Sequence, residues 1–341
     1  MTACAGTAKV HVASPPDTAT TTPVASESPT PTPTPTPTAT KPGPILTDGH
    51  TVALGFTVTA VVPAGPVVYA VGGDSETVTV ARIDVAAKSV TAQRSFPGDT
   101  VRASVGGGAL AVLVTGHSTT IARLDLRTLA VTAERTLAVR AAGVLARPEA
   151  TYVSTPGSIL VLDPATLQTR HGIVVDNDPQ QGAYGAEIAA DPRSHILYAG
   201  IPSSSHPLID VVDLRTGRIL ARPRVPAVVV AEPQGYGDDS WAVFATGMMA
   251  AAELLTPTGH VRTTLAQIGP NTATIAVTGL HLWTFAPSFH QNIQCRDLSH
   301  GAIEGSEPDP AVGMVTAADD THVYLGGNDS LSIYTPGGAC A

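Results

Sequence analysis

The sequence is poor in charge, in aromatic side chains and in cysteine. Charged residues make up 14% and aromatic residues 4% of its 341 residues, and only three are cysteines. Three cysteines without paired CxxC spacing are too few for a disulfide scaffold or a cysteine-ligated zinc site. Acidic residues outnumber basic ones by 28 to 19, which argues against a nucleic-acid partner because phosphate contacts need a basic face. No apolar run reaches the roughly 18 residues that span a bilayer.

Hydrophobic residues are abundant, at 43%, and the chain contains 32 glycines and 29 prolines. This apolar share is sufficient for a hydrophobic core and excludes a wholly disordered chain. Through residues 45–341, short runs of Val, Ile, Leu and Thr alternate with turns of Gly, Pro, Asp and Asn, and no long amphipathic helical pattern occurs. The pattern indicates an all-β body.

Residues 1–13 resemble the end of a lipoprotein signal, because small residues stand directly before Cys4 in Met1-Thr2-Ala3-Cys4. A complete signal peptide carries a basic and an apolar segment upstream, so either the start codon is placed too late or the numbering begins near the processing site. The alternative is a chance cysteine near the N-terminus. We expect lipidation at Cys4 and a location outside the cytoplasm, in the bacterial cell envelope on a lipid anchor, or secreted.

Residues 14–44 are predicted to be a disordered Pro/Thr-rich linker. The run from Pro29 to Thr38 alternates strictly between the two residues. Such a segment cannot bury enough apolar area to offset its entropy, and its prolines favour extended polyproline II. At about 3.1 Å per residue it is a semi-rigid spacer on the order of 100 Å long, typical of a stalk that holds a domain away from a membrane.

The body repeats with a period near 42 residues. Each unit carries an apolar residue, an anchor (most often Asp) and a turn with Thr or Gly; the anchors are Asp84, Asp125, Asp163, Asp213, Thr256, Asp297 and Thr335. A second marker precedes each anchor by 11–15 residues: Tyr69, Leu113, Tyr152, Tyr198, Phe244, Trp283 and Tyr324. About four short strands fit in each unit, which is the signature of a β-propeller blade.

We therefore predict a seven-bladed β-propeller with four-stranded blades over residues 45–341. The last unit ends after its third strand, and the segment Thr51–Leu54 belongs to no other blade. We expect this N-terminal segment to supply the missing strand and close the ring, since a closed ring leaves only short outer edges. A six- or eight-bladed ring and a β-sandwich are the alternatives, but a sandwich would not keep this period.

The fourth unit resembles the YVTN-type, YncE-like propeller repeat. Tyr198-Ala199-Gly200 is followed by Ile209-Asp210-Val211-Val212-Asp213-Leu214 and a Thr-Gly turn, and Ala189-Ala190-Asp191-Pro192-Arg193 is similar to the family's turn between the first two strands. The resemblance implies the fold of the whole body. It implies little about activity, because propellers serve as hydrolases, dehydrogenase subunits and binding modules alike.

Ligand sites on propellers usually lie at the mouth of the central channel. The loops that lead into the inner strands place five candidates there: Arg102, Arg140, Tyr184, Asn271 and Asp309. Two arginines and a tyrosine around one opening would suit an anionic or sugar-like ligand. The alternative is that these strand ends are polar only because the channel is wet.

The remaining chemistry-bearing residues give few signals. Cys295 and Cys340 fall on neighbouring blades, so a disulfide is one reading and a buried cysteine beside a frayed terminus is the other. Histidines 281, 290, 300 and 322 lack the spacing of a metal site, and no cofactor motif or catalytic signature occurs. We expect neither a metal nor a cofactor.

The sequence favours a non-catalytic binding or scaffold module, monomeric, whose partner is a protein, a glycan or a small ligand, with membrane contact through the lipid and no nucleic acid. The alternative is an extracellular propeller enzyme, lactonase-like or similar to amine or quinoprotein dehydrogenases, with its site at the channel mouth. Paired carboxylates, or a His–carboxylate pair, converging on the channel would support the enzyme; Glu187 and Asp309 are the carboxylates near the mouth.

Overall fold

The computed structural model describes residues 43–175, 186–190, 194–201, 208–223, 229–236, 239–246, 249–266, 274–278, 281–286, 292–297, 302–308 and 313–341. All of these belong to one unit of the chain, Pro42–Ala341. The described residues form antiparallel β-sheets and one short 3₁₀ helix, η1 (Gly338–Cys340). Within these ranges, no helix has the length and apolar character needed to cross a membrane.

The described strands pair into seven antiparallel sheets of four strands each. Sheet 1 contains β2 (Val58–Ala64), β3 (Val67–Gly73), β4 (Thr77–Asp84) and β5 (Ser89–Pro97). Sheet 2 contains β6 (Thr100–Gly106), β7 (Ala109–Thr115), β8 (Thr119–Asp125) and β9 (Val131–Leu137). Sheet 3 contains β10 (Gly143–Ala146), β11 (Thr151–Thr155), β12 (Ser158–Leu162) and β13 (Thr169–Val174). Sheet 4 contains β14 (Glu187–Ala189), β15 (Ile196–Ile201), β16 (Leu208–Asp213) and β17 (Arg218–Ala221).

The other three sheets follow in chain order, except that the last one combines one strand from the start of the body with three strands from its end. Sheet 5 contains β18 (Val229–Tyr236), β19 (Asp239–Thr246), β20 (Met249–Leu255) and β21 (Val261–Ala266). Sheet 6 contains β22 (Thr274–Thr278), β23 (His281–Ala286), β24 (Asn292–Asp297) and β25 (Ile303–Pro308). The shared sheet, as we name it, has the order β1 (Leu46–Ala53), β28 (Ser330–Pro336), β27 (Val323–Gly327) and β26 (Gly313–Ala318).

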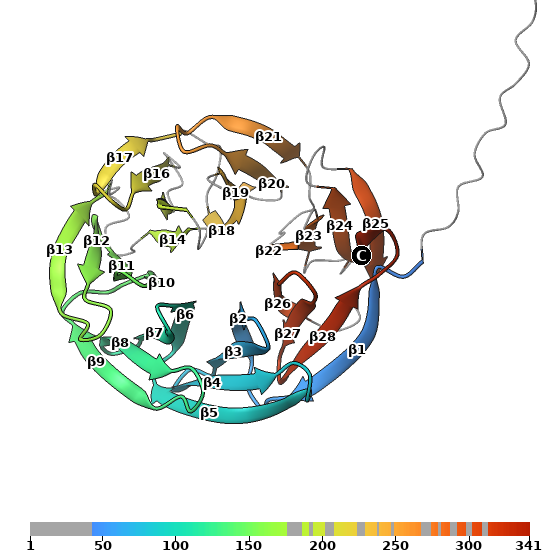
Figure 1. The fold of residues 1–341 in the computed structure, drawn as a ribbon, viewed down its shortest axis with the longest axis horizontal. Coiled ribbons are helices and arrows are strands. Elements are labelled where there is room, and N and C mark those ends of the chain that lie inside the picture. The colour runs from blue at the N-terminus through green and yellow to red at the C-terminus, as the bar shows by residue number, and fades with distance from the viewer. Residues whose placement is uncertain are drawn as a thin grey trace, which may run out of the picture. The chain divides into compact units, whose positions relative to one another are not determined.

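In sheets 1 to 6 the first strand lies nearest the centre and the fourth lies on the rim, whereas in the shared sheet β26 lies nearest the centre and β1 lies on the rim (Figure 1). Along the chain, each inner strand contacts the next one, from β2 through β6, β10, β14, β18 and β22 to β26, and β26 in turn contacts β2. This arrangement is that of a β-propeller. The arrangement is stable because each sheet buries its apolar faces against the neighbouring sheets.

The repeated aspartates form the turns between third and fourth strands. Asp125 Oδ1 accepts hydrogen bonds from the backbone N–H groups of Arg127 (3.0 Å) and Thr128 (2.8 Å) and from the Thr128 hydroxyl (2.8 Å). The turn ends at Leu129, whose φ of +56° is left-handed and whose N–H donates to Asp125 O at 2.9 Å. The same turn recurs around Asp163 and Asp213. Local side-chain acceptance of this kind is the usual role of Asp in turns.

Aromatic residues on the second strands join neighbouring sheets. Tyr69 and Tyr198 are buried, with exposed fractions of 0% and 1%. The Tyr69 hydroxyl donates to Leu126 O of sheet 2 at 2.6 Å, and the Tyr198 hydroxyl donates to Leu255 O of sheet 5 at 3.1 Å. Each ring therefore fills the space between two sheets while its polar end satisfies a carbonyl of the following sheet.

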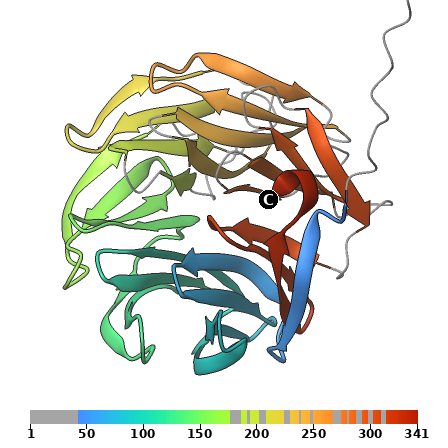
Figure 2. The ribbon, with the colours of Figure 1, turned by 45° about the vertical axis from the view of Figure 1, so that its right-hand side comes forward.

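In the shared sheet, β1 runs antiparallel to β28 from the pair Leu46–Pro336 to the pair Ala53–Ser330, with an irregularity between Thr47 and His50. The strand starts earlier than the predicted segment Thr51–Leu54. Figure 2 shows β1, in blue, lying alongside the red C-terminal strands. Strands from the two ends of the body therefore lie in one sheet.

Candidate functional site: the central channel

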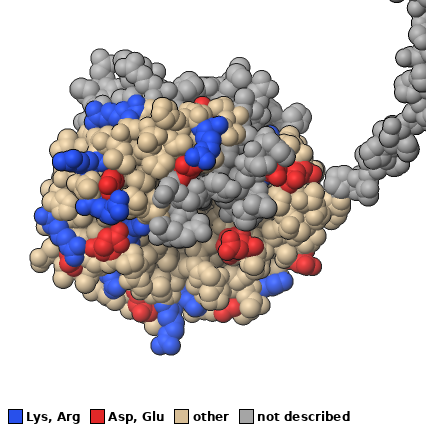
Figure 3. Space-filling model, turned by 45° about the horizontal axis from the view of Figure 1, so that its top comes forward, with Lys and Arg blue, Asp and Glu red and all other residues tan. Residues whose placement is uncertain are grey.

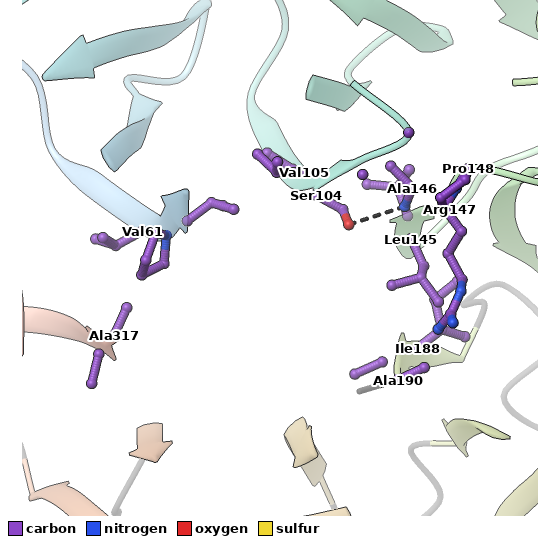
Figure 4. Close-up of a pocket in the computed structure, with 18 of the residues that line it drawn as sticks. Val61, Ser104, Val105, Leu145, Ala146, Arg147, Pro148, Ile188, Ala190 and Ala317 are labelled. Atoms are coloured by element: carbon purple, nitrogen blue, oxygen red, sulfur yellow. Dashed lines mark hydrogen bonds between the residues drawn. The ribbon is translucent and has the colours of Figure 1, made fainter. Parts of the chain in front are cut away.

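A cavity of about 550 Å³ lies at the centre, where the inner strands end. Strands β2, β6, β10, β14 and β26 contribute its described walls. The side chains that line it are mostly aliphatic, with Val61, Val105, Leu145, Ile188 and Ala317 among them (Figure 4), while polar groups contribute nearly as much of its surface as apolar groups do. A cavity of this size and polarity is in the range of small-ligand pockets.

Strands β6 and β10 approach closely at this end because Gly106 carries no side chain. A Cβ on Gly106 would overlap the carbonyl oxygen of Ala146 on β10, so only glycine allows β6 and β10 to approach this closely. The Ala146 N–H also donates to Ser104 Oγ at 3.0 Å, a bond that joins the two strands and is drawn in Figure 4. Ser104 is therefore engaged in holding the wall together.

Arg147 follows β10 and lies beside the cavity, near Leu145 and Ile188 (Figure 4). Its side chain is 10% exposed and its Nε stands 3.1 Å from Glu149 Oε1. Its Nη2 donates to Ser194 O at 2.5 Å. The bond to Ser194 connects sheet 3 to the segment that precedes β15 in sheet 4. The Glu149 carboxylate partly neutralises the positive charge of Arg147 at the cavity wall.

Arg102 and Glu187 form an ion pair next to the cavity, on the side where the inner strands begin. Arg102 on β6 places its Nη2 3.4 Å from Glu187 Oε1 on β14, although β10 stands between these two strands in the order around the centre. The cavity lining begins one position after each of them, at Ala103 and Ile188. The pair therefore borders the cavity on the side where the inner strands begin.

Both partners retain access to solvent, with exposed side-chain fractions of 37% for Arg102 and 28% for Glu187. Burial raises the pKa of the Glu187 carboxyl above its usual range, and the Arg102 guanidinium opposes that shift without cancelling it. At 3.4 Å and with partial exposure, the attraction is modest. Chemically, the pair is able to hold a proton at Glu187 or to exchange partners with a polar group in the channel.

The structure separates the sequence-predicted residues. Arg102 lies in the channel, in the third position of β6, whereas Arg140 is exposed in the segment between β9 and β10 and makes no hydrogen bond or ion pair with the described residues. Tyr184, Asn271 and Asp309 lie outside the described residues, as does the lipidation candidate Cys4. Whether those residues share a site with Arg102 therefore stays a prediction.

Residues 1–42, which hold the lipobox-like start and nearly all of the predicted linker, also lie outside the described residues. So do residues 176–185 and histidines 290 and 300. Within the described ranges, no group of three or more His, Cys, Asp or Glu side chains is placed to hold a metal ion.

Sequence reasoning missed the aliphatic end of the channel. It searched the loops entering the inner strands for polar residues, but the cavity lies where those strands end. A signal was present in the small residues at these ends, such as Pro63, Gly106 and Ala190. Reading it required knowing that five distant segments converge on one axis.

Charged side chains of both signs are scattered between wide neutral areas on the face that Figure 3 draws. The neutral areas match the low charged fraction of 14%. Neither sign forms a continuous patch over the described part of this face, so this face offers no charged binding surface.

Comparison with known proteins supports the fold and leaves the family open. No family model and no curated protein matches this chain. Hydrazine synthase of Kuenenia stuttgartiensis is similar in structure, with a TM-score of 0.65, 14% identity, and coverage of 83% of this chain and 96% of that one. The β-propeller domain of Cps50 (Swd1) from Myceliophteria thermophila has a TM-score of 0.62, 12% identity, and coverage of 82% and 99%. BamB from Moraxella catarrhalis has a TM-score of 0.57, 13% identity, and coverage of 81% and 84%.

Proposed function

We propose that this protein is an exported, lipid-anchored, seven-bladed β-propeller of the YVTN-repeat type, whose central channel is a non-catalytic binding site. In this proposal, β1 closes the ring, the Pro/Thr-rich segment is a stalk, and Cys4 carries the lipid. The family assignment rests on the repeat in the fourth unit, and the export rests on the lipobox-like start and the stalk composition.

The observation that carries the binding role is the cavity of about 550 Å³, which is lined mostly by aliphatic side chains and also exposes polar groups. Its walls offer apolar contact, and the ionisable groups at its border already have protein partners, Arg102 with Glu187 and Arg147 with Glu149. Apolar walls with a few oriented polar groups suit recognition of a ligand by shape and desolvation. The ligand is a small molecule, a glycan with an apolar face, or a protein segment.

The binding role is tested by titrating the full chain with an environment-sensitive apolar dye, an anilinonaphthalene sulfonate. We expect saturable binding with one site per chain. Ala317→Trp and, separately, Ala190→Trp place a large ring in the cavity and should weaken binding at least about tenfold, because they fill its volume. The matched control Ala87→Trp changes an exposed turn alanine and should leave binding unchanged. Equal dye binding in all four proteins would overturn the channel as the site.

One observation favours the alternative, an extracellular propeller enzyme of the lactonase type. A carboxyl with a raised pKa beside an arginine is a candidate proton donor or acceptor. Hydrolysis of a lactone panel by the wild type, abolished in Glu187→Gln with dye binding retained, would replace the non-catalytic proposal. Absence of turnover in the wild type would support binding alone.

The anchor is tested separately by metabolic labelling with an alkyne fatty acid in the native host, with the protein expressed from its own locus. We expect label on the wild type and none on Cys4→Ser. A wild type without label would contradict the lipid anchor while leaving the channel proposal standing.

A further inference from the structure

A disulfide joins the C-terminal tail to sheet 6. Cys295 lies on β24, Cys340 lies in η1 after β28, and their Cα atoms are 6.2 Å apart. Both residues are buried, with exposed fractions of 0% and 1%. The bond therefore crosses from the last segment of the chain to the sheet that precedes the shared sheet.

Ile45, directly before β1, and Leu46, its first residue, lie in the same apolar cluster as this bond. Ile45 and Leu46 are 2% and 7% exposed and pack with Trp283, Cys295 and Cys340. A glycine creates the space: a Cβ on Gly305 of β25 would overlap Ile45 Cγ2 and lie 3.3 Å from Cys340 Sγ. The side chain of Ile45 therefore fills a slot formed by sheet 6 and the disulfide.

The backbone of Ile45 is held from both sides. Its N–H donates to Glu307 Oε2 on β25 at 3.2 Å, and its carbonyl accepts from the N–H of Gly337, directly after β28, at 2.9 Å. The tail then passes close to the start of the described chain, since a Cβ on Gly338 would lie 3.0 Å from the carbonyl oxygen of Gly43. Gly338 has a φ of +59°, which glycine adopts without strain.

We propose that the Cys295–Cys340 disulfide is a redox-set clasp that retains β1 in the shared sheet. The strand is connected to β28 by hydrogen bonds and side-chain packing alone, because no hairpin joins them. The bond fixes the tail over Ile45, so β1 leaves the sheet only if the slot opens. This proposal does not depend on the lipid anchor or on the binding role of the channel.

The clasp forms when the two thiols give up two electrons and two protons to an exchanging disulfide of the thiol-oxidoreductase class, which becomes a dithiol. The reverse reaction needs an external dithiol, which is oxidised to its own disulfide as the two cysteines regain their protons. Because both sulfurs are buried, an attacking thiolate reaches them only when the tail moves away. The clasp is therefore stable in the folded protein and sensitive to reduction when the tail opens.

The experiment is hydrogen–deuterium exchange of the full chain, compared for the wild type, Cys340→Ser and Cys4→Ser. In Cys340→Ser we expect peptides covering β1 to exchange at least about tenfold faster, while peptides covering β3 and β4 stay within about twofold of the wild type. Cys4→Ser should match the wild type everywhere. Wild type opened in mild denaturant with dithiothreitol and then returned to buffer with the thiols blocked should reproduce the Cys340→Ser pattern.

Two outcomes would overturn the clasp. One is unchanged protection of β1 in Cys340→Ser, which would mean that hydrogen bonds and packing alone retain the strand. The other is an equal rise in exchange across β1, β3 and β4, which would mean that the bond supports the whole fold and not this strand. Because sheet 1 is read in the same sample, a variant that fails to fold is recognised as the second outcome.

Discussion

The shared sheet and sheet 2 have the same four-stranded antiparallel plan but are held together differently. In sheet 2, β6 to β9 are consecutive, and each pair is joined by a short turn. In the shared sheet, β26 to β28 are consecutive, but β1 comes from the other end of the body, so Thr51 and Ser332, whose hydroxyl oxygens are 2.9 Å apart, are 281 positions apart in the sequence.

Local turns bring strands together at little entropic cost, whereas a distant strand must first find its partner. Additional long-range contacts hold β1 in the shared sheet: the disulfide, the Glu307–Ile45 hydrogen bond and the packing of Ile45 into the slot at Gly305. Sheet 2 relies instead on aspartate-capped turns such as that of Asp125. The same sheet geometry therefore depends on local bonds in one place and on long-range bonds in the other.

Removing the disulfide should have the largest effect on this difference. For cysteines 45 positions apart, loop-closure entropy predicts that Cys295→Ser with Cys340→Ser lowers the free energy of unfolding by about 4 kcal/mol. Urea denaturation followed by circular dichroism measures it, with Cys4→Ser as the control. A loss below about 1 kcal/mol would show that the shared sheet needs no covalent support.

Shortening the side chain of Ile45, which fills the slot at Gly305, should have the second-largest effect on stability. Ile45→Ala removes buried methyl groups and should cost about 3 kcal/mol, as should Ile83→Ala in sheet 1, where Ile83 is 0% exposed. We expect the two variants to differ in location: limited proteolysis should cut near β1 in Ile45→Ala and not in Ile83→Ala. Identical cleavage patterns would remove the distinction between the two regions.

The buried tyrosines offer a smaller test. Tyr69→Phe breaks a bond between two sheets and should cost about 1 kcal/mol, since the Leu126 carbonyl loses the hydroxyl and keeps only the bond from Arg82 Nε at 3.1 Å. Tyr324→Phe breaks a bond within the shared sheet, where the hydroxyl donates to Asp319 Oδ2 at 2.5 Å, and should cost about 2 kcal/mol because that acceptor is charged. Thermal melts of the two variants at pH 7 give the comparison. The reverse order would contradict it.

The smallest expected effect is in the pH dependence of stability. Burial acts to raise the pKa of Asp319, but hydrogen bonds from Tyr324, Thr321 and His322 outweigh it and hold this pKa below its ordinary value. A depressed pKa contributes stability above the unfolded value of about 3.9, and this stability is lost as the pH falls through the folded pKa. Asp319→Asn should therefore flatten the loss of stability between about pH 5 and pH 2.

The pKa of Glu187 is shifted in the opposite direction to that of Asp319, so its effect on the pH dependence of stability has the opposite sign. Its pKa is raised by burial, so its contribution favours the fold below the unfolded value of about 4.3 and is lost as the pH rises through the folded pKa. Glu187→Gln should therefore raise stability slightly at pH 7 relative to the wild type. Melting curves at pH 4 and pH 7 separate the two residues.

The turns were accessible to sequence reasoning because their bonds are local. Asp125 and Asp163 bond backbone groups two and three positions ahead, so the spacing from Asp to Thr carries the information. The strands of the first unit also follow from local patterning, since β4 (Thr77–Asp84) is a short run of Val, Thr and Ile between turn residues. Alternation of apolar and polar residues and the turn residues between them sufficed for this.

The channel could be predicted only in part. Arg102 and Glu187 were each placed near the channel mouth from the register of the repeats, but they are 85 positions apart, and nothing in the sequence paired one with the other. Arg140 occupies a similar place in the sequence of its unit, yet it lies exposed outside β10. Arg102 is the third residue of β6, whereas β10 begins three positions after Arg140, so the start of each strand decides whether the arginine borders the channel.

The sequence by itself determined the all-β character, the period of the repeat and the chemistry of the turns, because each depends on residues a few positions apart. Only the tertiary structure decided that aliphatic strand ends enclose a cavity, that Arg102 meets Glu187, and that Ile45 lies in a slot formed by Gly305 and the Cys295–Cys340 bond. These features depend on distances between sheets, which the packing of neighbouring sheets against one another fixes.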